Sequence, residues 1–142
     1  MRVSFAVEGV HGQGRPRFTR SGRVYKAAAD REWEAKVRSG YERAVGNAPL
    51  RPVEACLSVE IEVSGHLPQS RPKKVSSEPW LARPDADNIA KAVLDALNGV
   101  AWRDDAQVVR LVVVKRDRRR GDPDQTRVTI EDAPGYETEK IG

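Results

Sequence analysis

Eleven residues of strict alternation constrain the fold of this chain more than any other feature. From residue 53 to residue 63 every second side chain is apolar, the set being Val53, Ala55, Leu57, Val59, Ile61 and Val63. Successive side chains of a β-strand point to opposite sides of a sheet, so a period of two predicts a strand with one side buried. The chain is therefore expected to form a sheet with one covered face.

Other segments predict further strands and two irregular stretches. Residues 2–8 place their apolar side chains on one side of an extended segment, and residues 107–116 are rich in β-branched residues. Residues 126–131 are expected to form a short strand. The Gly-, Pro- and Arg-rich stretch 9–24 is expected to have no regular structure. Residues 64–84, with four prolines, are expected to form a long loop.

Two amphipathic helices are expected between the strands. From about Tyr25 to Val45 apolar residues recur every four positions, and a second helix should run from about Asp87 to Asn98 with Gly99 after its end. The residues expected to face the core are Ala29, Trp33, Val37 and Tyr41 in the first helix and Ile89, Ala92, Val93, Ala96 and Leu97 in the second.

The composition fits one compact domain. The chain has 142 residues, of which 39% are hydrophobic and 32% charged. No stretch approaches the roughly 18 apolar residues of a membrane span, and the first residues lack the apolar run of a signal peptide, so a cytoplasmic protein is expected. Cys56 cannot form a disulfide within the chain, and with His11 and His66 it falls short of the ligands that structural zinc usually takes.

Charge is unevenly distributed along the chain. The formal net charge is +4, from 25 basic and 21 acidic residues. The last twelve residues carry four acids and one lysine, a net charge of −3, which leaves residues 1–130 with 24 basic and 17 acidic residues, a net charge of +7. Residues 1–132 are expected to form the domain, and residues 133–142 a flexible acidic tail.

Three separate basic segments lie in this domain. They follow the first strand, occupy the proline-rich loop, and run from Lys115 to Arg120. Such segments favour a polyanionic partner such as nucleic acid, although each of them alone is also typical of a solvated loop. The residues expected to contact DNA are Arg15, Arg17, Arg20, Arg23, Lys26, Lys73, Lys74 and Lys115.

Acidic side chains gather around the start of the second predicted helix. Asp85 lies just before this helix and Asp87 at or near its N-cap, so their carboxylates can converge, with Lys91 one turn further along. Asp104 and Asp105 stand at the entrance to the next strand, where sheet pairing is expected to bring them back beside the helix start.

Converging carboxylates in a basic protein are typical of a site for a hard divalent cation. Mg²⁺ prefers oxygen ligands and keeps several waters, which leaves room for a phosphate oxygen and an attacking water. Lys91 is placed to stabilise negative charge on that phosphate. The pattern favours metal-dependent phosphodiester hydrolysis.

Each feature also has an ordinary structural explanation. Asp87 alone is a common helix N-cap, and an Asp87–Lys91 pair stabilises a helix. Asp104 and Asp105 suit a turn before a strand. An EF-hand is excluded, because Ala90 stands where that calcium-binding loop requires glycine.

A longer pattern runs through the same region. It consists of Asp-x-Asp-Asn, a lysine three residues after the asparagine, Asp-Ala-Leu, and a tryptophan before Asp-Asp-Ala-Gln-Val, all within residues 83–116. This stretch resembles the RusA family of crossover junction endodeoxyribonucleases, the Holliday junction resolvases of bacteria and their phages. The segment GRPRFTRSGRVY near the start also looks familial, so the resemblance covers most of residues 1–131.

The resemblance implies specific site residues. Family members bind metal through three aspartates and use a lysine in catalysis. Matched position by position, the expected catalytic set is Asp85, Asp87, Lys91 and Asp105, the expected metal ligands are its three aspartates with Asp104 as a lower-ranked neighbour, and Asn88 and Gln107 are expected in supporting roles.

The resemblance also implies a fold and an activity. It implies an α+β fold, a single small domain in which a mixed β-sheet of about four strands packs against two main helices. It further implies a homodimer that binds four-way DNA junctions and uses Mg²⁺, or Mn²⁺ in its place, to make paired symmetric nicks in recombination and repair. Two alternatives remain open: a metal-dependent nuclease acting on forks, flaps or duplex DNA, and a non-catalytic DNA-structure-binding protein.

Overall fold

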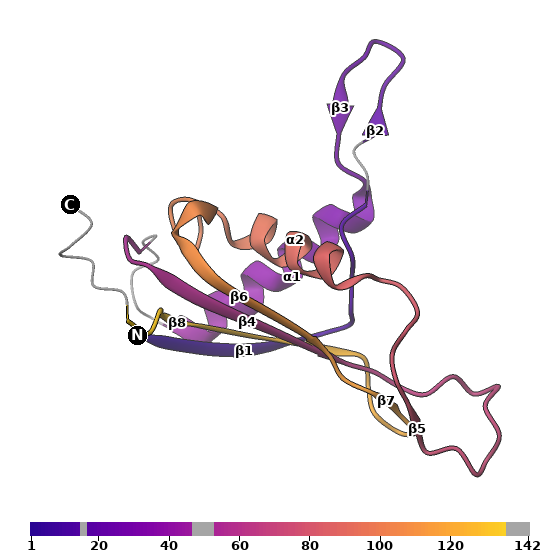
Figure 1. The fold of residues 1–142 in the computed structure, drawn as a ribbon. Coiled ribbons are helices and arrows are strands. Elements are labelled where there is room, and N and C mark those ends of the chain that lie inside the picture. Colours follow the sequence, from indigo (N-terminus) through magenta and orange to yellow (C-terminus); the bar gives the residue numbers. More distant parts are fainter. Residues whose placement is uncertain (15–16, 47–52, 136–142) are drawn as a thin grey trace.

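A four-stranded sheet forms the centre of the computed structural model, which describes residues 1–14, 17–46 and 53–135 (Figure 1). Its strands are β1 (Arg2–Glu8), β4 (Leu57–Ser64), β6 (Val108–Lys115) and β8 (Gln125–Asp132). They lie in the order β1, β8, β4 and β6. β8 is antiparallel to both neighbours, whereas β4 and β6 are parallel. The prediction of a mixed sheet is confirmed.

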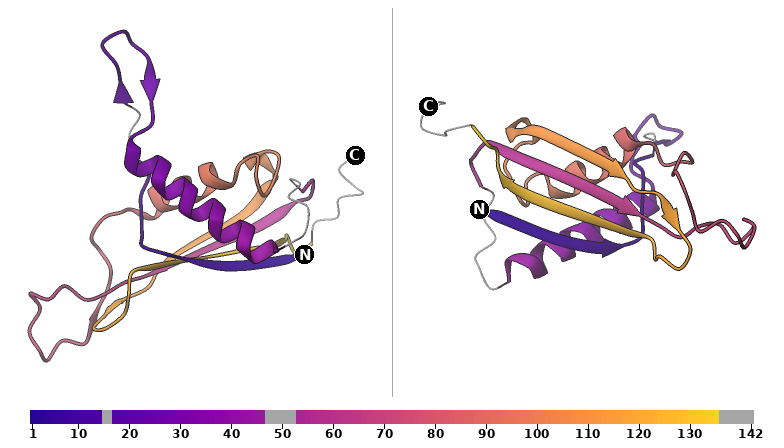
Figure 2. Two further views of the ribbon diagram at one scale, coloured as in Figure 1. Left: turned by 180° about the vertical axis from the view of Figure 1, so that it is seen from behind. Right: turned by 60° about the horizontal axis from the view of Figure 1, so that its bottom comes forward.

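Two helices, α1 (Ala28–Val45) and α2 (Ala86–Leu97), cover one face of the sheet (Figure 2, left). The alternating residues Leu57, Val59, Ile61 and Val63 of β4 are buried in a core that both helices share. On the other face none of the described elements crosses the strands, which lie in front in the right-hand view of Figure 2. The single-domain α+β fold with two main helices is thus confirmed.

The long alternating segment is shorter as a strand than the pattern predicts. β4 begins at Leu57. Val53 instead forms an isolated bridge with Trp102, and the Val53 N–H donates to the Ala101 carbonyl. The first residues of the alternation therefore pair with the turn before β6 and not with the main sheet.

Helix α1 differs from the prediction in its first turn. It begins at Ala28 and not near Tyr25, and Ala29 is exposed, while Trp33, Val37 and Tyr41 are buried as predicted. In this first turn the buried position belongs to Asp30, whose carboxylate is hydrogen-bonded to the imidazole of His11.

Helix α2 follows its predicted pattern closely. All five residues expected to face the core are buried, and Gly99 follows the C-cap Asn98 with a φ of +78°, a left-handed conformation that favours glycine. The helix begins at Ala86, so its N-cap is Asp85 and not Asp87.

Short strand pairs occur in both stretches that were expected to be irregular. β2 (Arg17–Phe18) and β3 (Val24–Tyr25) form a hairpin, and β5 (Ser77–Glu78) pairs with β7 (Arg118–Arg119). The hairpin turn is held by the Arg23 N–H, which donates to the Thr19 hydroxyl at 3.1 Å. Strands of two residues have no measurable period, which is why the pattern missed them.

Three further expectations concern burial and the end of the domain. Trp33 is buried as predicted, and Trp80 and Trp102 are buried as well. β8 is longer than the predicted 126–131 strand. After it, Ala133, which was expected to begin the flexible tail, is buried and donates its N–H to the Cys56 carbonyl. Most of the predicted tail, residues 136–142, lies outside the described residues. Neither described helix is long and apolar enough to cross a membrane.

Candidate active site at the start of helix α2

Two exposed carboxylates lie at the start of α2. Asp85 is the N-cap residue, but its side chain accepts no capping hydrogen bond, and Asp87 accepts only the adjacent Asn88 N–H at 2.9 Å. Both residues are exposed, as is Lys91 one turn further along. The N-terminus of a helix favours negative charge, so two ionised carboxylates are well placed here. Their oxygens remain available to a ligand from solvent.

A clamp formed by Trp80, Lys115 and Arg118 holds the chain that leads to Asp85. The Trp80 ring is buried, with the Arg118 guanidinium 4.6 Å and the Lys115 ammonium 5.9 Å from its centroid. The same ammonium donates to the Ala82 carbonyl at 2.8 Å. We call these three side chains the Trp80 clamp. It fixes the segment before Asp85 against the carboxyl end of β6.

A second contact fixes α2 from the loop after β1. The Gln13 N–H donates to the Asn88 carbonyl at 2.9 Å, and the Gln13 side-chain amide donates to Asp95 at 3.0 Å. A Cβ atom on Gly12 would come within 2.5 Å of the Pro84 Cβ, so only glycine fits at this approach. The first turn of α2 is thus held from two sides.

The other expected acids form a separate turn before β6. The 3₁₀ helix η1 (Asp105–Gln107) is capped by Asp104, which accepts the Ala106 N–H at 2.9 Å. The Gln107 amide donates to the carbonyls of Val53 and Ala55. Gln107 therefore supports the turn that carries both aspartates.

Asp105 is oriented by a buried tryptophan. The Trp102 Nε1–H donates to Asp105 Oδ1 at 2.7 Å, and the Trp102 side chain is fully buried. The second carboxylate oxygen makes no hydrogen bond to any of the described residues. Asp105 is thus held at a fixed place with one oxygen available.

The structure places the two groups of aspartates at opposite ends of α2. β6 starts directly after η1, and its last residue, Lys115, contacts Ala82 just before α2, so the strand and the helix run in opposite directions. The twelve residues of α2 span about 18 Å. In the described part of the chain, no three His, Cys, Asp or Glu side chains lie close enough to hold a metal ion. The expected return of Asp104 and Asp105 to the helix start does not occur within one chain.

The predicted DNA-contacting residues divide into three groups. Arg20, Arg23, Lys73 and Lys74 are exposed. They lie on the β2–β3 hairpin and on the loop before β5, which both project from the side of the molecule where α2 begins (Figures 1 and 2). Lys26 instead pairs with Glu34 and lies 3.9 Å from Asp95, and Lys115 belongs to the Trp80 clamp. Arg15 lies outside the described residues, and Arg17 is described only by its backbone in β2.

Comparison with known proteins assigns the chain to a family. The family model "Endodeoxyribonuclease RusA" matches residues 9–131. The chain belongs to the RusA family. It is 34% identical to "Uncharacterized protein YqaN" of Bacillus subtilis (strain 168) over 80% of this chain and 86% of that protein. It is 31% identical to "Crossover junction endodeoxyribonuclease RusA" of Shigella sonnei and of Escherichia coli (strain K12), in each case over 78% of this chain and 73% of the relative. The resemblance seen in the sequence is confirmed.

Sequence reasoning missed several residues around the RusA-family motif. Gln13, His11 and Asp30 meet near the start of α2, and Trp80 anchors the segment before it. No local spacing connects these positions. The glycines on either side of Gln13 were the one indication of these contacts in the sequence, since glycine permits the close approach to the segment before α2 that the structure shows at Gly12.

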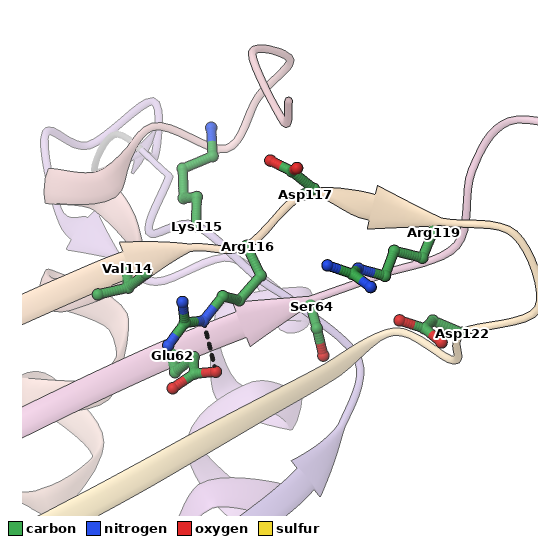
Figure 3. A pocket seen from close by; sticks show the side chains of 8 residues that line it. All are labelled: Glu62, Ser64, Val114, Lys115, Arg116, Asp117, Arg119 and Asp122. Carbon is green, nitrogen blue, oxygen red and sulfur yellow. Dashed lines mark hydrogen bonds and ion pairs between the residues drawn. The ribbon is translucent and has the colours of Figure 1, made fainter. Parts of the chain in front are cut away.

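A larger cavity lies on the open face of the sheet, around the carboxyl ends of β4 and β6 (Figure 3). It measures about 630 Å³, and its charged lining residues balance in sign. Arg116 is paired with Glu62 at 2.7 Å, and the hydrogen bond from this guanidinium holds the pKa of Glu62 below its usual value. The lining residues are Glu62, Ser64, Val114, Lys115, Arg116, Asp117, Arg119 and Asp122. With no excess of positive charge, this cavity is a weak candidate for an anion site.

Proposed function

We propose that this chain is a metal-dependent endodeoxyribonuclease that resolves four-way DNA junctions by paired symmetric nicks, in DNA recombination and repair. The observation that carries the proposal is the pair Asp85 and Asp87, exposed and free of capping bonds at the start of α2. The RusA-named relatives and the family's nuclease assignment support it. Since the matched relatives are bacterial, we place its action in the bacterial cytoplasm, as a protein of the host or of a phage.

Mg²⁺ is the cation that this donor set favours, with Mn²⁺ as a substitute. Asp85, Asp87 and Asp105 are proposed as its ligands, with Asp104 beside them, because hard carboxylate oxygens suit such a cation. When bound, the cation supplies a more acidic water and neutralises charge on the phosphate. Lys91 is proposed to stabilise the negative charge that develops on the phosphate.

A homodimer would complete this set of ligands. Asp105 cannot reach Asp85 and Asp87 in its own chain, so we propose that it meets those of a second copy. β6 forms an edge of the sheet, and its Val109 and Leu111 are 38% and 42% exposed. Exposed apolar side chains on an edge strand suit a contact between copies. A two-fold dimer also matches a junction in which two opposed strands are cut.

The exposed basic residues on the hairpin and the loop are proposed to bind DNA. The β2–β3 hairpin, which carries Arg20 and Arg23, and the loop before β5, which carries Lys73 and Lys74, lie on two sides of the segment that leads to α2 (Figure 1). Lysine and arginine side chains contact backbone phosphates without regard to sequence. They would hold the arms of a junction while the carboxylates face the strand to be cut.

Replacing one carboxylate tests the proposed site. Asp87→Asn should abolish Mg²⁺-dependent nicking of a synthetic four-way junction while binding, measured in Ca²⁺, stays unchanged or becomes tighter, because one charge that repels DNA is removed. Glu42→Gln is the matched control, since Glu42 is exposed on α1 away from the site. Nicking by Asp87→Asn at the rate of the unaltered protein would refute the metal-site assignment.

Substrate choice tests the junction assignment. The purified protein should nick a four-way junction faster than a replication fork, a flap or a linear duplex of the same sequence. Equal rates on all of these substrates would favour a nuclease of broader range. Binding to the junction without nicking in either Mg²⁺ or Mn²⁺ would favour a non-catalytic DNA-binding protein.

A further inference from the structure

A small cavity lies beside the first turn of α2. It measures about 360 Å³ and lies between the loop after β1 and the segment that leads to Asp85. Its lining residues are Val10, His11, Gly12, Gln13, Arg83, Pro84 and Asn88. These residues come from two distant parts of the sequence, and the Gln13–Asn88 hydrogen bond and the Gly12–Pro84 contact fix them together.

His11 is held in this cavity by a buried carboxylate. Its Nε2 lies 2.6 Å from Asp30 Oδ1, and the Asp30 side chain is only 5% exposed. This bond fixes the orientation of the imidazole ring. The Trp33 ring, with its centroid 5.8 Å from that of the imidazole, packs against His11. The ring is therefore fixed, and its second nitrogen, Nδ1, remains for another partner.

The lining of this cavity suits an anion. It contains the imidazole of His11, the guanidinium of Arg83 and the amide of Asn88, and it includes no acidic residue. Of the nearest acids, Asp30 is bonded to His11, and Asp85, 4.0 Å from the Arg83 guanidinium, is not part of the lining. The larger cavity of Figure 3, by contrast, has three acids in its lining.

We propose that this cavity binds a backbone phosphate of the DNA strand that is cut, adjacent to the scissile one, with the imidazole of His11 and the guanidinium of Arg83 as its contacts and Asp30 as the residue that positions the imidazole. The cavity shares Asn88 and Pro84 with the segment that carries Asp85 and Asp87, so a strand lying across these carboxylates passes over it. The inference rests on the proposed nuclease function. It adds His11 and Asp30 to the DNA-contacting machinery.

The test combines variants of His11 with neutral phosphates. Binding of a four-way junction is measured in Ca²⁺, with single methylphosphonate linkages placed in turn at each position around the nick. His11→Gln is the principal variant, because its amide still donates to Asp30 and the fold is kept. For the unaltered protein, one linkage next to the cut should weaken binding about tenfold, since a charge-assisted hydrogen bond is lost.

The variants should remove this sensitivity. His11→Gln should bind the normal junction about tenfold more weakly. The neutral linkage next to the cut should then cause no further loss of affinity, because the substitution and the neutral linkage remove the same contact. Asp30→Asn should give the same pattern more weakly, because the ring is present but the hydrogen bond that orients it loses its charged acceptor. Arg43→Gln, at an exposed position near the end of α1, should keep the full sensitivity.

Two results would overturn the inference alone. One is a His11→Gln protein with unaltered binding and unaltered sensitivity to the neutral linkage. The other is a His11→Gln protein that binds normally but nicks slowly in Mg²⁺, which would make His11 a proton acceptor and not a phosphate donor. If the unaltered protein bound no junction at all, the proposed function would fail together with this inference.

Discussion

Close packing at single residues sets strict limits on substitution in this fold. A Cβ atom on Gly40 of α1 would lie 2.8 Å from the side chains of both Phe5 and Val7 on β1. Both neighbours are buried in the core and have little freedom to move. The absence of a side chain at Gly40 is what allows the helix to lie this close to the first strand.

Gly40→Ala should therefore destabilise the protein, even though alanine is the better helix former. Overpacking of a core contact costs about 1 to 3 kcal/mol, which outweighs the gain of about 1 kcal/mol in helix propensity. Urea unfolding followed by circular dichroism measures the net change. Ser39→Ala, at the exposed neighbouring position, should not lower stability, and a Gly40→Ala protein as stable as the unaltered one would contradict the packing argument.

Individual side chains were predictable where pattern alone decides burial. The buried face of α2 and the buried residues Trp33, Val37 and Tyr41 of α1 followed from apolar spacing. Lys26 and Lys115 were expected to face DNA, yet both ammonium groups are used within the protein, by Glu34 and by the Ala82 carbonyl. Such partners come from distant positions, so a count of charges along the sequence does not reveal them.

At the scale of elements, the Trp80 clamp connects the sheet to the site. Through Lys115 and Trp80, the end of β6 holds the segment immediately before α2. A carboxylate pair binds a cation well only if the backbone that carries it is fixed. The position of Asp85 and Asp87 therefore depends on residues that touch neither of them.

Lys115→Met should raise the Mg²⁺ concentration needed for half-maximal nicking by several-fold, because loss of the bond to Ala82 loosens the segment before Asp85. A Mg²⁺ titration of nicking at saturating DNA measures this. Lys73→Met removes a charge of the same sign from the exposed loop and should weaken DNA binding without changing the Mg²⁺ requirement. If both variants altered only DNA affinity, Lys115 would be a DNA contact and not a clamp.

Long elements could be read from the sequence, and short ones could not. The strands β1, β4 and β6 and both helices carry a period over many residues, and their existence was predicted. The β2–β3 and β5–β7 pairs have two residues in each strand, and their pairing depends on a turn or on a partner far along the chain. Local patterns carry too little information to specify contacts of that kind.

At the scale of the whole molecule, topology decides how the site is completed. The short connection between α2 and β6 makes the strand return antiparallel to the helix, which leaves Asp105 beyond the far end of α2, a helix about 18 Å long, from Asp87. The sequence suggested that these acids converge. That expectation failed within one chain because spacing shows which residues are near in sequence but not the direction in which the next strand runs. The proposed completion of the site by a second copy rests on that direction.

Mixing two inactive variants tests completion by a second copy. Asp87→Asn and Asp105→Asn should each be inactive alone, whereas mixed dimers contain one site with all its aspartates and should nick the junction in one strand. Refolding the two variants together from denaturant, followed by a junction-nicking assay, measures this. If each site were formed within one chain, both sites of a mixed dimer would stay defective and no nicking would return.

The place of β8 in the sheet affects how the protein is made. β8 is the last strand in the sequence, yet it lies between β1 and β4 and is hydrogen-bonded to both. As the chain leaves the ribosome, β1 emerges more than one hundred residues before β8, the strand with which it pairs in the main sheet. The sheet can close only once residues 125–132 are free, so the nascent chain must keep the apolar sides of β1 and β4 apart from other chains until β8 has been synthesised.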